Sequence, residues 1–129
     1  MSTFTQTHKE EIVRILAGYP ADQKRAAVMP LLHLAQQDAG YISGEVLQEI
    51  AVICEVTSTE VASIVGFYTM FHDEPAGKIR LMVCTDVACR LRGAREYLTA
   101  LCSELGIAPG QTTADGLVTI EEVKCIAAC

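Results

Sequence analysis

The sequence predicts an α+β protein in which a bundle of short helices precedes a strand–helix–strand unit. The first part of the chain carries apolar residues at helical spacing, with capping residues between them. An acidic pair, a proline and a glycine then fall together in residues 73–77, a composition typical of a linker. Two short apolar segments follow, with a helical segment between them. We therefore expect two domains, residues 1–76 and residues 77–129.

Composition argues against several classes of protein. Half of the 129 residues are hydrophobic, which indicates a folded chain and not a disordered one. No apolar run approaches the roughly 18 residues of a membrane span, and the N-terminus lacks the features of a secretory signal. A net charge of −6 argues against a nucleic-acid-binding protein. We expect a cytoplasmic protein with no direct membrane insertion.

Two helices are expected before residue 41. The first covers residues 8–18 and ends before Pro20, because the residue preceding a proline is pushed away from helical angles. The second covers residues 25–39. Pro30 then lies near its first turn, where a missing N–H costs little, and Gly40 provides a C-terminal stop.

Two further helices are indicated by their N-terminal caps. Ser43 is expected to cap a helix that ends at Cys54. Thr57 and Glu60 form the pattern of a capping box, in which each side chain accepts a hydrogen bond from the other residue's backbone N–H. The residues of this last helix that we expect to face inward are Val61, Ile64, Val65 and Tyr68.

An aromatic cluster ends the helical part. Phe67, Tyr68 and Phe71 are three of the seven aromatic residues and lie within five positions. Such a cluster is usually core, and the alternative is a docking patch for a partner subunit. The three side chains cannot all point the same way on one helix, so at most two would belong to such a patch. Residues 1–77 also carry the whole net negative charge, with 4 basic and 10 acidic side chains.

The second part is predicted to be a βαβ unit. Residues 79–83 form a mostly apolar strand, which we expect to be buried on both faces and to lead into Cys84. A helix covers residues 91–105, and residues 117–123 form a second strand that leads into Cys125. Parallel strands of this kind present the loops that follow them at the same edge of the sheet.

Four cysteines follow the two strands as close pairs, Cys84-x4-Cys89 and Cys125-x3-Cys129, and we place Cys89 in a loop. All four sulfurs should therefore surround one cavity. Thiolates select zinc or iron–sulfur centres. Structural zinc favours tighter pairs, most often Cys-x2-Cys, whereas a [2Fe–2S] cluster takes two cysteines per iron and suits wider loops. On spacing alone, zinc, a disulfide pair and chance remain alternatives.

No other chemistry is indicated by the sequence. Cys54 and Cys102 lie on helical apolar stripes, where a free cysteine behaves as a small hydrophobic residue. No HExxH, GxGxxG or GxxxxGK[ST] motif is present, and no nucleophile–base arrangement is evident, so we predict no catalytic residue. Four basic residues lie near the cysteine pairs, either as a salt-bridged solvent face or as cations that raise a cluster's potential. They are Arg90, Arg92, Arg95 and Lys124.

Taken together, the helical bundle, the Gly66–Phe71 segment, the cysteine pairs and the Asp115–Gly116 turn resemble a known family. This is the family of the thioredoxin-like [2Fe–2S] subunit, the E-type subunit, of respiratory complex I (NADH:quinone oxidoreductase). Relatives occur in NAD-linked hydrogenases and formate dehydrogenases. The resemblance covers essentially the whole chain and implies a thioredoxin-like α/β ferredoxin domain with a [2Fe–2S] cluster. The implied ligands are Cys84, Cys89, Cys125 and Cys129.

The resemblance also implies a role and partners. The chain would be an electron-transfer subunit with no turnover of its own, beside a flavin- and NADH-binding subunit and other iron–sulfur subunits that hold it peripherally at the membrane. The equivalent subunit of a hydrogenase or formate dehydrogenase is one alternative, and a structural zinc-binding assembly module is another. Family members continue beyond the fourth cysteine, so we expect that the chain ending at Cys129 is truncated and its ferredoxin domain incomplete.

Overall fold

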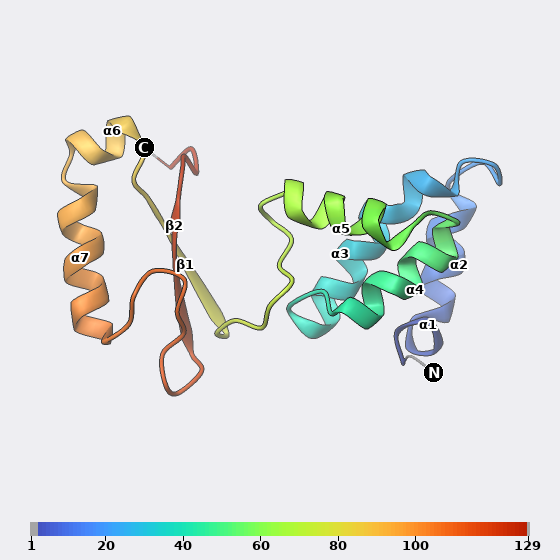
Figure 1. The fold of residues 1–129 in the computed structure, drawn as a ribbon, viewed down its shortest axis with the longest axis horizontal. Coiled ribbons are helices and arrows are strands. Elements are labelled where there is room, and N and C mark those ends of the chain that lie inside the picture. Colours follow the sequence, from blue (N-terminus) through green and yellow to red (C-terminus); the bar gives the residue numbers. More distant parts are fainter. Residues whose placement is uncertain (1–2, 129) are drawn as a thin grey trace. The chain divides into compact units, whose positions relative to one another are not determined.

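The computed structural model describes residues 3–128. The chain divides into two compact units, Met1–Pro75 and Ala76–Cys129 (Figure 1). The first, which we call the helical unit, contains helices without strands in its described part. The second, which we call the cysteine unit, contains two strands and two helices in its described part.

The helical unit begins with a short helix that the sequence did not predict, so that the expected helix at residues 8–18 is preceded by another. The helix expected at 25–39 also starts with a 3-10 turn. Pro30 is the third residue of the α-helix that follows, and Gly40 ends that helix with a φ of 79°. The elements are α1 (Thr3–Thr7), α2 (Lys9–Ala17), η1 (Lys24–Ala27), α3 (Val28–Ala39), α4 (Gly44–Cys54) and α5 (Ser58–Phe67).

Both predicted caps are confirmed. The Ser43 hydroxyl accepts a hydrogen bond from the N–H of Val46 at 3.3 Å, at the start of α4. At the start of α5, the Thr57 hydroxyl accepts from the Glu60 N–H, and the Glu60 carboxylate accepts from the Thr57 N–H at 3.0 Å. These local bonds satisfy backbone donors that the helix itself cannot pair. They fix where each helix begins.

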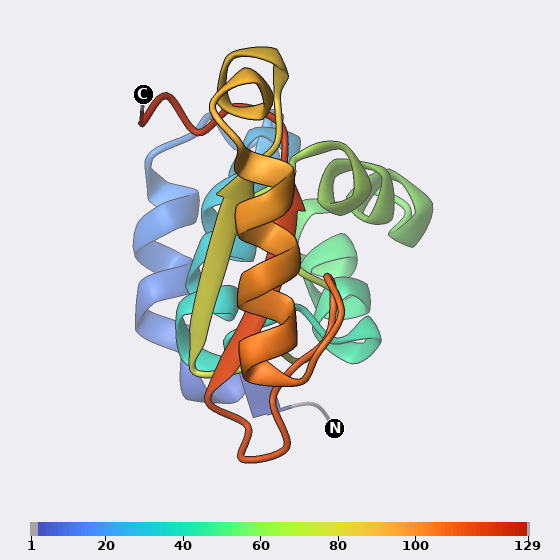
Figure 2. The ribbon, with the colours of Figure 1, turned by 90° about the vertical axis from the view of Figure 1, so that its left-hand side faces the viewer.

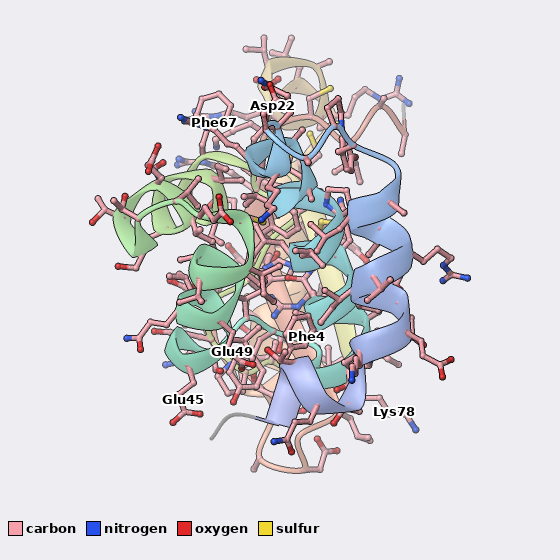
Figure 3. All side chains as sticks on the ribbon, turned by 90° about the vertical axis from the view of Figure 1, so that its right-hand side faces the viewer. Phe4, Asp22, Glu45, Glu49, Phe67 and Lys78 are labelled. Atoms are coloured by element: carbon pink, nitrogen blue, oxygen red, sulfur yellow. The ribbon has the colours of Figure 1, made fainter. Side chains whose placement is uncertain are left out.

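The core of the helical unit consists of side chains from every one of its helices. The buried Phe4 of α1 and Glu49 of α4 are labelled in Figure 3. The N–H of Thr5, the neighbour of Phe4, donates to the Glu49 carboxylate at 2.9 Å. Tyr68 was expected to face inward, and this prediction is wrong. Tyr68 is the C-cap of α5 and lies beyond its last turn, with 43% of the residue exposed. The buried core residues are Phe4, Ile12, Ala27, Val28, Leu31, Leu32, Ala35, Ile42, Ile50, Ala51, Cys54, Val61, Val65 and Phe71.

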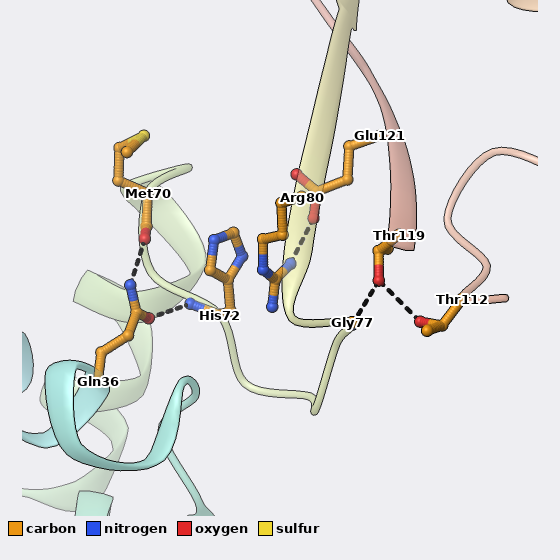
Figure 4. A network of polar contacts seen from close by, with 8 residues as sticks. All are labelled: Gln36, Met70, His72, Gly77, Arg80, Thr112, Thr119 and Glu121. Carbon is orange, nitrogen blue, oxygen red and sulfur yellow. Dashed lines mark hydrogen bonds and ion pairs between the residues drawn. The ribbon is translucent and has the colours of Figure 1, made fainter. Parts of the chain in front are cut away.

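The segment after α5 is tied back to α3 by one side chain. The Gln36 amide donates to the carbonyl of Met70 at 2.7 Å and accepts from the N–H of His72 at 2.8 Å (Figure 4). Between these bonds, the buried Phe71 ring packs on the His33 ring with centroids 4.8 Å apart. Of the aromatic cluster, Phe71 is therefore core, whereas Phe67 and Tyr68 remain exposed.

The cysteine unit is the predicted βαβ arrangement. Its elements are β1 (Ile79–Cys84), α6 (Val87–Leu91), α7 (Ala94–Leu105) and β2 (Val118–Val123). The strands are parallel and in register from Ile79 opposite Val118 to Cys84 opposite Val123. Helix α7 packs on one face of the two strands and runs alongside them (Figure 2). The expected helix at 91–105 is interrupted, because Gly93 adopts a φ of 89° between α6 and α7.

Polar and close backbone contacts hold the base of the sheet. A Cβ at Gly77 would lie 2.8 Å from the backbone of Val118, so no side chain fits there. The Gly77 N–H donates to the Thr119 hydroxyl at 2.6 Å, and that hydroxyl also bonds the Thr112 hydroxyl at 2.7 Å (Figure 4). Arg80 and Glu121 form an ion pair across the strands.

The expectation that β1 is buried on both faces is wrong. Ile79 is 54% exposed and Met82 is 41% exposed. The described part of the sheet has only two strands, and α7 covers only part of their surface. A parallel strand is buried on both faces only where helices cover both faces of the sheet.

Among residues 3–128, no single helix is long and apolar enough to cross a membrane. Helices α4 and α5 reach that length and composition only as a pair, and the pair is bent by 117° at the break between them.

Candidate metal centre

The strand register brings Cys84 and Cys125 to one edge of the sheet. Cys84 is the last residue of β1 and lies opposite Val123, the last residue of β2. Cys125 follows two residues later, and its N–H donates to the Cys84 sulfur at 3.2 Å. Residues 41 positions apart in sequence are thus in direct contact. This contact follows from the parallel pairing, since equivalent ends of parallel strands lie side by side.

Cys89 was expected in a loop, and this prediction is wrong. It lies within α6, whose first turn begins because the Asp86 carboxylate accepts from the Val87 N–H at 2.9 Å. Asp86 thereby acts as an N-cap directly after the strand. One helical turn then brings the Cys89 thiol within hydrogen-bonding reach of the Cys84 sulfur.

Three of the four predicted ligands line one cavity of about 720 Å³: Cys84, Cys89 and Cys125. The fourth, Cys129, lies outside the described residues. Within the described part of the chain, no three Cys, His, Asp or Glu side chains converge closely enough to hold a single metal ion.

Backbone N–H groups surround the Cys84 sulfur. Those of Asp86, first in effect, and then of Cys125 and Ile126 donate to it and lower the pKa of the thiol, against the opposing effect of burial. Such donors favour the thiolate over the thiol. The thiolate is the form that binds metal. The local backbone is therefore arranged for an anionic sulfur at this position.

The loop after β2 has an unusual backbone conformation. Cys125 and Ala127 adopt left-handed φ values of 59° and 52°, although neither is a glycine. Left-handed residues at such spacing can turn successive N–H groups toward one point and create a concave site for an anion. Here the N–H groups of Cys125 and Ile126 both meet the Cys84 sulfur.

The other two cysteines do not line this cavity. Cys54 is 2% exposed in the core of the helical unit, and its burial raises the pKa of the thiol. Cys102 is half-buried on α7. Both positions agree with the expected packing role.

Two of the four basic residues near the cysteines illustrate the two interpretations, a cation beside the cluster site and a salt-bridged solvent face. Arg92 lines the cavity. Lys124 forms an ion pair with Glu122, Nζ to Oε1, at 3.2 Å. Neither Glu122 nor Thr85, which Lys124 also contacts, was predicted from the sequence to belong to the site. The sequence does contain a signal for both, because Thr85 directly follows Cys84 and Glu122 lies three residues before Cys125.

The donor set fits a [2Fe–2S] cluster. Thiol ligands, wide spacing around one cavity, and N–H groups aimed at a sulfur are the features that such clusters use. A cation that lines the cavity, Arg92, complements the negative charge of thiolates there.

Known proteins agree with this assignment. The sequence profile of the thioredoxin-like [2Fe-2S] ferredoxin family matches residues 12–129. The chain is 43% identical to the E 2 subunit of NADH-quinone oxidoreductase from Rhizobium meliloti, over 95% of this chain and 72% of that one. It is 39% identical to NADH-quinone oxidoreductase subunit 2 of Thermus thermophilus, over 98% of this chain and 70% of that one.

A solved structure has a similar fold. The crystal structure of an NAD+-reducing [NiFe]-hydrogenase in the H2-reduced state superposes with a TM-score of 0.61 at 24% identity, over 74% of this chain and 16% of that one. The chain belongs to the thioredoxin-like [2Fe–2S] ferredoxin family, in the group that includes the E-type subunits of NADH-quinone oxidoreductase, and this family implies a [2Fe–2S] cluster.

Proposed function

We propose that this chain is an electron-transfer subunit of an NADH-oxidising complex, NADH:quinone oxidoreductase, with Cys84, Cys89, Cys125 and Cys129 as the ligands of its cluster. The observation that carries the proposal is the contact of Cys125 with the Cys84 sulfur at 3.2 Å, within a cavity that Cys89 also lines. A bound [2Fe–2S] cluster supplies one-electron oxidation and reduction. The protein's residues hold the sulfurs, donate hydrogen bonds to them and partly shield them from water.

The partner in electron exchange is a flavin- and NADH-binding subunit. The sequence contains no GxGxxG or GxxxxGK[ST] phosphate-binding motif, so the hydride chemistry belongs to another chain. The relatives from Rhizobium meliloti and Thermus thermophilus are named as parts of NADH-quinone oxidoreductases, which supports the same place for this chain. Other iron–sulfur subunits complete the assembly, which holds this chain at the cytoplasmic side of the membrane. The isolated chain turns over no substrate.

The helical domain, residues 1–76, serves as the docking element in this proposal. Phe67, Tyr68 and Met70 are exposed by 78%, 43% and 62% at and just after the end of α5. Phe67 and Tyr68 also pack edge to face, with ring centroids 5.0 Å apart. Adjacent exposed apolar residues at the end of a rigid helix are suited to a protein interface, where aromatic residues and Met are enriched.

Serine variants of the cysteines test the ligand set. In the full chain, anaerobically reconstituted with iron and sulfide, Cys84→Ser and Cys125→Ser should lose or alter the visible charge-transfer bands and the signal of the reduced cluster in electron paramagnetic resonance. Cys54→Ser, the matched control, should retain the spectrum and lose only stability. A normal spectrum for Cys125→Ser, or a colourless protein that binds zinc, would contradict the proposal.

Capture of the flavin subunit tests the docking element. Phe67→Ser in the full chain should weaken capture, whereas Val52→Ser on α4 should not, because Val52 is exposed to the same degree, 79%, but does not belong to the exposed segment of residues 67–70. Equal capture by both variants and the unchanged chain would assign docking to another surface.

A further inference from the structure

Three polar side chains form a closed set of contacts beside the cysteines. The Thr85 hydroxyl donates to the carboxylate of Glu122. Lys124 donates through Nζ to the same hydroxyl at 2.9 Å and to the Glu122 carboxylate at 3.2 Å. Each of the three thus contacts the other two. We call this set, Thr85, Glu122 and Lys124, the Thr85 triangle.

The triangle lies beside Cys84 and Cys125. Thr85 directly follows Cys84, and Lys124 directly precedes Cys125. The last backbone bond between the strands runs from the Thr85 N–H to the carbonyl of Val123 at 3.0 Å. Beyond that bond, the triangle is the side-chain link that joins the residue after Cys84 to the residue before Cys125.

We propose that the Thr85 triangle is a positioning device that holds the Cys84 and Cys125 loops at the spacing the cluster requires. This inference rests on the proposed ligand set. Thr85, Glu122 and Lys124 are positioning residues, since they act through the cysteines beside them.

The Thr85 hydroxyl is the member of the triangle that fixes the geometry most strongly, because it is the buried one. Thr85 is only 4% exposed, whereas the side chains of Lys124 and Glu122 are 68% and 37% exposed. An exposed ion pair alone contributes little and fixes little geometry. A buried hydroxyl that donates to a carboxylate and accepts from an ammonium is directional at both bonds, and bonds to charged groups are the stronger kind.

The loop after β2 has a backbone conformation that needs stabilising contacts. Cys125 and Ala127 are left-handed, a conformation that non-glycine residues adopt at a cost. Such a loop needs outside contacts to stay in place. Lys124 is the residue from which the loop departs, so fixing its side chain to Thr85 fixes the start of the loop and the N–H of Cys125 that meets the Cys84 sulfur.

The test compares two buried threonines of the same sheet. Thr85→Val removes the hydroxyl and keeps the shape, and Thr85→Ser restores the hydroxyl. The matched control is Thr119→Val at the opposite end of the sheet, because Thr119 is also 4% exposed and also makes two hydroxyl contacts. Both valine variants should have a lower free energy of unfolding, so an effect that arises only from lost stability should appear in both variants.

Two measurements separate positioning from stability. In the full cluster-free chain, the N–H of Cys125 should exchange with deuterium about tenfold faster in Thr85→Val than in Thr119→Val, because one or two hydrogen bonds to charged groups are lost. In the reconstituted chain, a chelator should remove iron about tenfold faster from Thr85→Val and not from Thr85→Ser. The signal of the reduced cluster in electron paramagnetic resonance should also broaden in Thr85→Val alone.

Equal exchange rates at Cys125 in the two valine variants would overturn the inference. If Thr85→Val does not fold, Lys124→Met replaces it, since an exposed side chain can be truncated without leaving a buried gap, and the same acceleration is expected. The exchange experiment needs no cluster, so it can fail while the ligand set holds. Failure of the unchanged chain to take up a cluster would instead contradict the proposed function.

Discussion

Each of the two units of this protein is stabilised internally by a different kind of interaction. In the helical unit, the buried apolar residues form one continuous core drawn from all its helices. In the described part of the cysteine unit, only Leu98 and Ile120 are buried apolar residues, and several strand residues remain exposed. Its described structure relies on polar contacts, a tight backbone approach at Gly77 and the groups around the cysteines. Burial of apolar surface is the dominant source of folding free energy. The helical unit should therefore be stable by itself, whereas the cysteine unit should gain stability from what it binds.

Truncating a core leucine is the largest expected perturbation. Leu31→Ala should lower the free energy of unfolding of the helical unit by about 3–4 kcal/mol, because the side chain is completely buried and leaves a cavity. Leu105→Ala on α7 should cost the cysteine unit only about 1–2 kcal/mol, because that side chain is already partly in water. Hydrogen exchange resolved by peptide measures each unit separately. Equal costs in the two units would contradict the comparison.

Adding a methyl group to a glycine should have opposite effects in the two units. Gly77→Ala should destabilise the cysteine unit by roughly 2 kcal/mol, because the new Cβ would meet the backbone of Leu117 and Val118 within 2.9 Å and backbone yields poorly. Gly66→Ala in α5 meets no atom within 4 Å and should stabilise the helical unit by about 1 kcal/mol through helix propensity. Thermal unfolding of the two variants measures both. A destabilised Gly66→Ala would show that this site is constrained in a way the contacts do not reveal.

Local sequence predicted the helical unit better than the cysteine unit, for a physical reason. Caps such as Ser43 and the Thr57–Glu60 box act within four residues, so their pattern is readable from the chain alone. The strand–helix–strand order and the meeting of Cys84 with Cys125 were also predictable, because parallel pairing dictates them. The exposure of β1 was not, since burial of a strand depends on what covers it and not on its own composition.

The local structure around the cysteines was not predicted, because its sequence signals are weak or depend on residues far apart in the chain. The helix around Cys89 begins because Asp86 caps it, and Asp86 is the signal for this helix in the sequence. The left-handed backbone at Cys125 and Ala127 has no signal in sequence, because glycine, which usually marks it, is absent. The Thr85 triangle depends on side chains 37 and 39 positions apart in sequence, which only the strand register brings together.

Relieving the strained loop should give a smaller effect of opposite sign. Ala127→Gly should stabilise the cysteine unit by about 0.5–1 kcal/mol, because glycine adopts a left-handed φ without the cost that Cβ imposes, less its greater freedom in the unfolded chain. Ala88→Gly, within α6, should be destabilising by a similar amount. The midpoint of thermal unfolding measures both. If Ala127→Gly lowers the midpoint, the left-handed conformation is not a cost at this position.

The smallest expected effect is a pH dependence confined to the helical unit. The Glu60 carboxylate accepts a hydrogen bond from the Thr57 N–H at 3.0 Å and another from the Thr57 hydroxyl at 2.9 Å. It also forms an ion pair with Arg25, Nη1 to Oε1, at 2.9 Å. The Thr57 bonds, chiefly, hold the pKa of Glu60 below its ordinary value of 4.5. The unfolded chain therefore binds the proton more tightly, so the carboxylate's contribution to stability is present above pH 4.5 and is lost as the pH falls through the lowered pKa.

The stability of the unchanged chain should exceed that of Glu60→Gln by a constant amount near neutral pH, and this difference should shrink in acid. In a Thr57→Ala background the shrinkage should be smaller, because the main hydroxyl partner is gone. Urea unfolding of the four chains between neutral and acidic pH measures this, and a difference that stays constant down to acid would rule out the capping carboxylate as its source.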